Sequence, residues 1–242
     1  MRARPPAGNR RMQIGLLLFP NLTQLDLAGP FEVFARTPGA TVHVVWKTAD
    51  PVRTDRGLML TPTTTFATCP QLDVICVPGG PGQIDLMDDD ETLDWLRRQA
   101  KGARWITSVC TGSLVLAAAG LLDGYKAACH WASRDQLALL GAVPVDARVV
   151  IDRNRVSGGG VTAGIDFALS LVAAMLGEDA AKEIQLGIEY DPAPPFNAGS
   201  PHRADAALVA STRGKMAPML ARRREATDRA AARRASAAGG SD

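Results

Sequence analysis

The segment from Arg104 to Gly120 reads RWITSVCTGSLVLAAAG, and it places Cys110 between two different patterns. The short apolar run before the cysteine predicts a strand, and the Ala- and Leu-rich run after it predicts a helix. No loop separates the two, so the chain must turn sharply at Cys110. In a parallel α/β sheet, such a corner presents its side chain at the carboxyl edge, where these sheets bind ligands.

The corner position of Cys110 favours a reactive thiol. Free N–H groups and the helix dipole at the start of the following helix favour the thiolate, so we expect a pKa below the usual value of about 8.5. A thiolate held in this way is an activated nucleophile. We also expect a sparsely populated backbone conformation at this residue. The pattern alone leaves open that a small cysteine simply fits a tight corner.

Apolar or β-branched runs alternate with longer helical patterns along the chain, which predicts a single-domain α/β fold with a mostly parallel sheet and helices on both faces. Pro30 is expected in the first turn of its helix, where proline is tolerated. The predicted β segments lie at residues 13–19, 40–48, 57–66, 72–80, 104–109, 126–131, 147–152 and 154–160. The predicted helices lie at residues 25–36, 88–102, 111–120, 133–141, 161–177, 178–190 and 203–234.

The ends of the chain differ in composition from its middle. We expect a disordered tail at residues 1–11, an α/β catalytic domain at 12–201, a C-terminal helix packed on that domain at 202–235 and a flexible end at 236–242. The Pro-rich segment 191–201 fits neither helix nor strand and should cross the surface. The basic cluster of the last helix could bind a phosphate backbone, although a solvated helical face is the simpler interpretation.

Composition narrows the function. The 242 residues carry a net charge of +2 and are 46% hydrophobic, which gives no general reason to expect a nucleic-acid or membrane partner. Four cysteines without a C-x-x-C pair, and no signal-peptide pattern, favour reduced thiols in a cytoplasm. The three histidines are far apart in the sequence, so we expect neither a metal site nor a cofactor.

Two further motifs should lie near Cys110. Gly79 and Gly80, in VPGGPG, end the predicted strand 72–80, and their N–H groups could stabilise negative charge on a substrate. Asp26 follows the first strand in LDLAGPFEVF. Its carboxyl group could carry protons as a general acid–base, or it could simply cap the helix.

Together, DLAGPFEVF, DVICVPGG and TSVCTGSLVLAAAGLLDG resemble the PfpI-type superfamily, which has the class I glutamine amidotransferase-like α/β fold with a nucleophile elbow. More narrowly, EYDPAPPFNAGSP and the C-terminal RREATDRAAAR resemble the isonitrile-hydrating members. The resemblance implies a homodimer that hydrates a small-molecule isonitrile to an N-substituted formamide without a cofactor.

The resemblance also assigns roles to residues. It implies that Cys110 is the catalytic nucleophile, that Asp26 is the carboxylate hydrogen-bonded to it, and that the Thr111 hydroxyl faces the site. Substrate-binding roles are expected for Gly79, Gly80, His130 and Gly159. A core role for His130, on the predicted strand 126–131, stays open.

Three alternatives remain. A deglycase or glyoxalase activity on reactive carbonyls would use the same thiolate but usually a glutamate in place of Asp26. The protease members carry histidine where this chain has Thr111, which speaks against peptide hydrolysis. The sensor domains of AraC-type transcription regulators share DLAGPFEVF, but the residues after Pro201 are too few for their paired helix-turn-helix motifs. Cys110 could also be an oxidisable sensor in a stress-protective protein.

Overall fold

The computed structural model describes residues 11–239. The expected disordered tail therefore lies outside the described residues except for Arg11, as do residues 240–242 of the expected flexible end.

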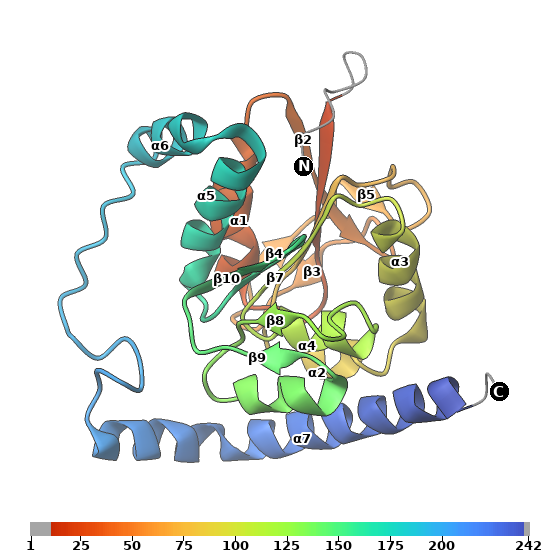
Figure 1. The fold of residues 1–242 in the computed structure, drawn as a ribbon, viewed down its shortest axis with the longest axis vertical. Helices are drawn as coiled ribbons and strands as arrows, with labels where there is room; N and C mark the ends of the chain where they lie inside the picture. The colour runs from red at the N-terminus through yellow and green to blue at the C-terminus, as the bar shows by residue number, and fades with distance from the viewer. Residues whose placement is uncertain (1–10, 240–242) are drawn as a thin grey trace.

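The central element is a seven-stranded sheet in the order β10-β11-β7-β6-β1-β2-β5, and every neighbouring pair is parallel except β10 and β11 (Figure 1). Its strands are β1 (Met12–Leu17), β2 (Ala40–Trp46), β5 (Thr64–Thr65), β6 (Val74–Val77), β7 (Trp105–Val109), β10 (Val149–Asp152) and β11 (Arg155–Gly158). Two small sheets pair β3 (Val52–Arg53) with β4 (Met59–Leu60) and β8 (Lys126–Ala127) with β9 (Val143–Pro144).

Helices cover both faces of this sheet. The helices are α1 (Gln24–Ala35), α2 (Gln83–Leu86), α3 (Asp90–Ala100), α4 (Gly112–Ala118), α5 (Ala163–Leu176), α6 (Glu178–Gly187) and α7 (Ala206–Gly239), with the 3-10 helix η1 (Arg134–Leu140). In Figure 1, α1 and α5 lie on one side of the strands and α3 lies on the other. The predicted doubly covered, mostly parallel α/β fold is confirmed.

The core forms because strands that are buried on both faces carry continuous apolar runs. All four residues of β6 are buried, as is the second half of β1. Between α1 and α5, Phe34 meets Phe167 edge to face, with ring centroids 5.9 Å apart. This packing holds α1 against α5.

Pro30 corrects an expectation. It lies in the middle of α1 rather than in its first turn. Its ring packs against α5 at Gly164, where a Cβ would lie only 2.9 Å from Pro30 Cδ. The two helices therefore approach closely at a point where a larger residue would separate them.

Other elements also differ from prediction. The segment expected at 57–66 is divided between β4 and β5, which belong to different sheets, and β3, β9 and α2 were not predicted. The strand expected at 126–131 is reduced to Lys126–Ala127, so His130 lies in the turn that follows it. The helix expected at 133–141 is a 3-10 helix, and it ends at Gly141 in the left-handed conformation, with φ of 80°. These last two differences lie in residues 126–141, a segment that packs against α4.

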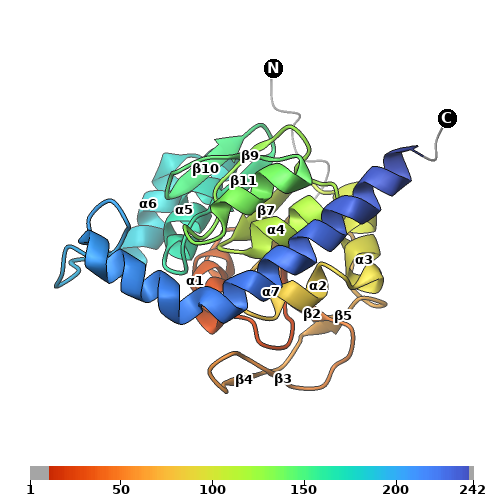
Figure 2. The same ribbon diagram turned by 90° about the horizontal axis from the view of Figure 1, so that it is seen from below.

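The C-terminal helix α7 runs across the end of the domain formed by α2, α4 and η1, as Figure 2 shows from below. It continues to Gly239, beyond residue 235, where the helix was expected to end. One stripe of α7 is buried, namely Arg223, Ala226, Thr227 and Ala230. Their spacing of three and four residues is that of a helix face packed on a core.

Candidate active site

Four chain segments meet at one edge of the sheet. Strands β1, β6, β7 and β11 are parallel neighbours, so their carboxyl ends lie together. The register pairs Val77 with Ser108 and Val109 with Gly158, at the carboxyl ends of β6, β7 and β11. The predicted site segments that follow each strand are therefore brought together by topology alone.

Cys110 occupies a strained corner, as predicted. Its φ is +56°, in the left-handed region that a residue with a Cβ rarely adopts. The corner is held because Cys110 N–H donates to Gly158 O at 2.9 Å, and α4 begins two residues later. The side chain is 5% exposed. This is the geometry of a nucleophile elbow.

Hydroxyl groups beneath the corner fix the neighbouring segment. Ser113 Oγ lies 2.8 Å from Ser108 Oγ and donates to Ala128 O at 2.6 Å. Ala128 N–H in turn donates to Ser157 Oγ at 2.8 Å. These buried bonds tie β7, α4 and β11 to residue 128, next to Cys129, so the elbow is rigid on three sides.

Asp26 is fully buried and faces the turn after β6. Its Oδ2 accepts a hydrogen bond from Gly79 N–H at 2.9 Å. The N-cap of α1 is Thr23, so Asp26 does not cap the helix, and that alternative interpretation is wrong. Its Oδ1 is buried and accepts no hydrogen bond among residues 11–239.

Burial is the main influence on the pKa values of Asp26 and Cys110. Loss of solvation raises the pKa of Asp26 to about 7, although the Gly79 N–H and the Cys110 side chain lower it. Burial, with the neighbouring Asp26 and Cys129, also raises the pKa of Cys110 well above its usual value. The expected depression of the Cys110 pKa is thus reversed, because desolvation outweighs the Thr111 N–H and the Arg223 charge that favour the thiolate.

The glycine turn has a different role from the one expected. Gly79 N–H donates to Asp26, and Gly80 N–H donates to Thr111 Oγ1 at 3.1 Å. Neither amide is free in this structure to stabilise a charged substrate, so the turn instead orients the two side chains. A Cβ on Gly79 would lie 2.6 Å from Thr111 N and 2.9 Å from Asp26 Oδ2, which leaves room only for glycine.

Thr111 is buried with its hydroxyl directed at the same turn. Its Oγ1 accepts from Gly80 N–H, and its contact with Gly80 O, at 3.5 Å, is long for a hydroxyl donor. The hydroxyl therefore makes only a weak hydrogen bond as a donor, and it can donate to a bound molecule instead.

His130 has hydrogen-bond and ring partners of its own. Its Nδ1 accepts from Ala132 N–H at 3.3 Å, and its ring lies 5.7 Å from that of Trp131. Burial and the nearby Arg223 lower its pKa to about 4, so it is neutral with its proton on Nε2. No hydrogen bond joins it to Cys110 or Asp26 among the described residues.

Gly159 follows the residue that anchors the elbow. Its N–H donates to Arg148 O at 2.8 Å, and an added Cβ would lie 3.0 Å from Ala147 O. It therefore packs the end of β11 against the segment before β10.

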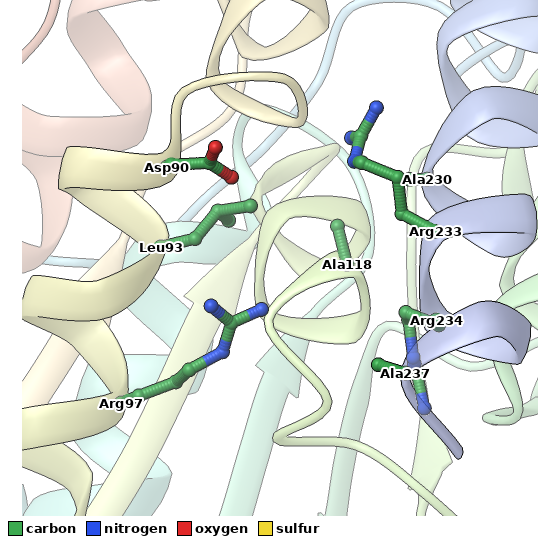
Figure 3. Close-up of a pocket in the computed structure, with 8 residues that line it drawn as sticks. All are labelled: Asp90, Leu93, Arg97, Ala118, Ala230, Arg233, Arg234 and Ala237. Atoms are coloured by element: carbon green, nitrogen blue, oxygen red, sulfur yellow. The ribbon is translucent and has the colours of Figure 1, made fainter. Parts of the chain in front are cut away.

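Two small cavities lie elsewhere. One, of about 200 Å³, lies between α3, α4 and α7 (Figure 3). Three arginines line it, and each forms an ion pair with a nearby aspartate. The other, of about 140 Å³, lies between Trp131 and residues 198–212. Neither is lined by Cys110, Asp26 or Thr111, so neither is the candidate active site.

Residues 12–174 match the sequence pattern of the DJ-1/PfpI family, and this span includes the β1–α1 junction, the glycine turn and the elbow. The chain belongs to the DJ-1/PfpI family. It is 57% identical to an isonitrile hydratase of Pseudomonas putida over 92% of this chain and 97% of that one. It is also similar to the crystal structure of a ThiJ/PfpI family protein from Pseudomonas syringae, with a TM-score of 0.87 and 47% identity over 91% of this chain and 90% of that one.

A more distant relative bears on one alternative. The chain is 32% identical to the HTH-type transcriptional regulator GbdR of Pseudomonas aeruginosa over 77% of its own length, but it covers only 53% of that regulator. The likeness to DNA-binding proteins of this kind therefore involves one part of their chains.

Helix α7 lies outside the residues matched by the DJ-1/PfpI family, yet it sends one side chain toward the site. Arg223 is 2% exposed and donates to Gln83 Oε1 at 2.7 Å and to Ser133 Oγ at 3.0 Å. Sequence reasoning missed it because several arginines share this helix. The only signal was its spacing from Ala226 and Ala230, which marks the buried face.

Proposed function

We propose that this protein is an isonitrile hydratase, which hydrates an isonitrile to an N-substituted formamide. The observation that carries the proposal is the buried pair of Asp26 and Cys110 on an elbow, within a chain that is 57% identical to such an enzyme over nearly its whole length. A deglycase reading is less well supported, because this chain has aspartate where those members usually have glutamate.

The first step adds the thiol across the terminal isonitrile carbon. With one proton shared by the pair, Cys110 Sγ forms a bond to that carbon while Asp26 transfers the former thiol proton to it. The product is a thioformimidate, R–N=CH–S–Cys. The S–H bond has been replaced by an S–C and a C–H bond, and nothing is oxidised or reduced. The pair is suited to this step because a carboxyl group with a pKa near 7 can both accept and donate the proton.

The second step releases the product. Water adds to the thioformimidate carbon, and its proton passes through Asp26 to the imine nitrogen. The tetrahedral adduct, R–NH–CH(OH)–S–Cys, then loses the sulfur as the C=O bond forms, which gives R–NH–CHO and regenerates the Cys110 thiol. We assign to the Thr111 hydroxyl, whose contact with Gly80 O is long, the role of orienting the water or the adduct.

Formamide production from cyclohexyl isonitrile tests the proposal. We expect the purified protein to convert the isonitrile to N-cyclohexylformamide, detected by mass spectrometry. Cys110→Ala should produce none, and Thr111→Val should lose about 10²-fold, as is typical of one positioned hydrogen bond. A folded wild-type protein that yields no formamide would overturn the proposal.

The working form is proposed to be a cytoplasmic homodimer. Reduced, free cysteines support the compartment. Among the described residues, no helix has the length and apolar character needed to cross a bilayer. Exposed apolar side chains on α6 and after it support the dimer.

A further inference from the structure

Arg223 is a buried cation without a carboxylate partner. Among residues 11–239, no Asp or Glu side chain forms an ion pair with its guanidinium. Its partners are neutral: Gln83 Oε1, Ser133 Oγ and, at 3.7 Å, Met219 Sδ. A buried charge of this kind is unfavourable unless something compensates it, so its retention calls for a compensating anion.

The neighbours of Arg223 identify that anion. The ionisable groups that interact with its charge are the thiols of Cys129 and Cys110 and the imidazole of His130, which is neutral and so cannot be the anion. Seen from Cys110, the facing groups are Asp26 from α1, Cys129, the Thr111 N–H and the Arg223 cation. Because Asp26 and Cys129 both disfavour the thiolate, Arg223 is the cation that offsets them at this position.

The hydrogen bonds of Arg223 also join two segments that flank the elbow. Gln83 begins α2, directly after the turn that orients Asp26 and Thr111. Ser133 follows His130, and its N–H donates to His130 O at 2.9 Å. The planar guanidinium therefore clips together the turn after β6 and the loop after β8, as its fixed fork of donors allows.

We propose that Arg223 is a positioning residue of the active site, which supplies from α7 the positive charge that stabilises ionised Cys110 and fixes the two segments beside it. The inference rests on the proposed function only in taking Cys110 as the nucleophile. It makes α7 part of the reactive centre rather than a surface appendage.

The test is the rate of Cys110 alkylation by iodoacetamide as a function of pH, read from the Cys110 peptide by mass spectrometry. Arg223→Gln keeps a hydrogen-bonding side chain but removes the charge. We expect the Cys110 rate at a fixed pH near neutrality to fall about tenfold, which corresponds to a rise of about one pKa unit. Arg223→Lys should retain most of the wild-type pH profile while lowering the turnover of isonitrile, because the fork is lost.

Arg229→Gln is the matched control, since Arg229 lies on the same helix in an exposed ion pair with Asp88. It should alkylate like the wild type. Gln83→Glu gives an independent route if Arg223→Gln does not fold, because a carboxylate beside Arg223 neutralises its charge and should slow alkylation in the same direction. Wild-type alkylation profiles in folded Arg223→Gln, or in Gln83→Glu, would overturn the inference. Absence of formamide in the wild type would instead count against the proposed function, and it would leave the alkylation result standing.

Discussion

Asp26 and Cys110 are two acids in a site from which water is nearly excluded. Desolvation raises the pKa of both, so the pair holds on to protons that isolated side chains would release. Near neutral pH the carboxyl group is close to half ionised, and the pair then has the single shared proton that addition to an isonitrile needs. The reactive state therefore arises from mutual coupling and not from a free thiolate at a helix end.

This coupling predicts a stability that depends on pH through Asp26. Because the pKa of Asp26 rises from 3.8 to about 7 on folding, the folded state binds more protons within that window. Its contribution to the free energy of unfolding is complete below the unfolded pKa and is lost as pH rises through about 7, by up to about 4 kcal/mol. Asp26→Asn should remove this loss, so the variant should unfold at higher urea concentration than the wild type at about pH 8.

Asp26→Asn should also abolish formamide production, because an amide cannot accept and return a proton. Exposed Asp50→Asn is the control for both measurements, and it should match the wild type. An active Asp26→Asn variant, or one with the wild-type dependence of unfolding on pH, would contradict this account of the carboxyl group.

The sequence predicted that Cys110 and Asp26 lie near the ends of recognisable strands, and the family resemblance implied the roles of Cys110, Asp26 and Thr111, which stay predictions. The sequence could not show that the Gly79 and Gly80 amides are occupied, since hydrogen-bond partners follow from tertiary packing. Arg223 was hidden for a related reason: in an Ala- and Arg-rich helix, the buried arginine is chosen by how the helix docks.

At the scale of elements, short turns place the site more tightly than the helices do. The turn between β6 and α2 holds both Asp26 and Thr111, and it passes so close to the elbow that residue 79 has no room for a side chain. Most strands of the central sheet and most helices could be predicted from hydrophobic period. The short strands β3 and β9, helix α2, the 3-10 helix η1 and the position of Pro30 could not, because they depend on packing against other elements, as the close approach of Gly164 to the Pro30 ring shows.

Gly79→Ala should therefore damage the site without touching Cys110. The added Cβ would force Thr111 and Asp26 apart, so we expect about a 10²-fold loss of formamide production and about 1–3 kcal/mol of lost stability. Gly160→Ala is the matched control, because a Cβ there meets no atom within 4 Å. Equal activity of the two variants would show that the turn can relax and that its close packing does not set the geometry of the pair.

At the scale of the whole molecule, α7 is bound to the domain by charged and buried contacts, whereas α6 and the segment after it carry exposed apolar side chains. Helix α7 lies across the domain and fixes itself with buried and charged contacts, including those of Arg229 and Arg233 with Asp88. In Figure 1, helix α6 lies beside α5 at the edge of the domain, and the segment that leads from α6 to α7 extends away from the rest of the chain. Large apolar side chains at Leu186 and Phe196, 82% and 80% exposed, are the most exposed of their kind among the described residues.

Such exposed side chains favour burial against a second copy of the chain. We expect the wild type to have twice the 25.6 kDa mass of one chain in light scattering coupled to size exclusion. Leu186→Asp with Phe196→Asp should shift the protein to the single-chain mass, because a buried interface cannot accept two unpaired carboxylates. Leu58→Asp, at a 51% exposed position on the β3–β4 loop, should leave the dimer intact. A wild-type protein with the mass of one chain would contradict the dimer. A double variant that remains dimeric would show that the interface lies elsewhere on the chain.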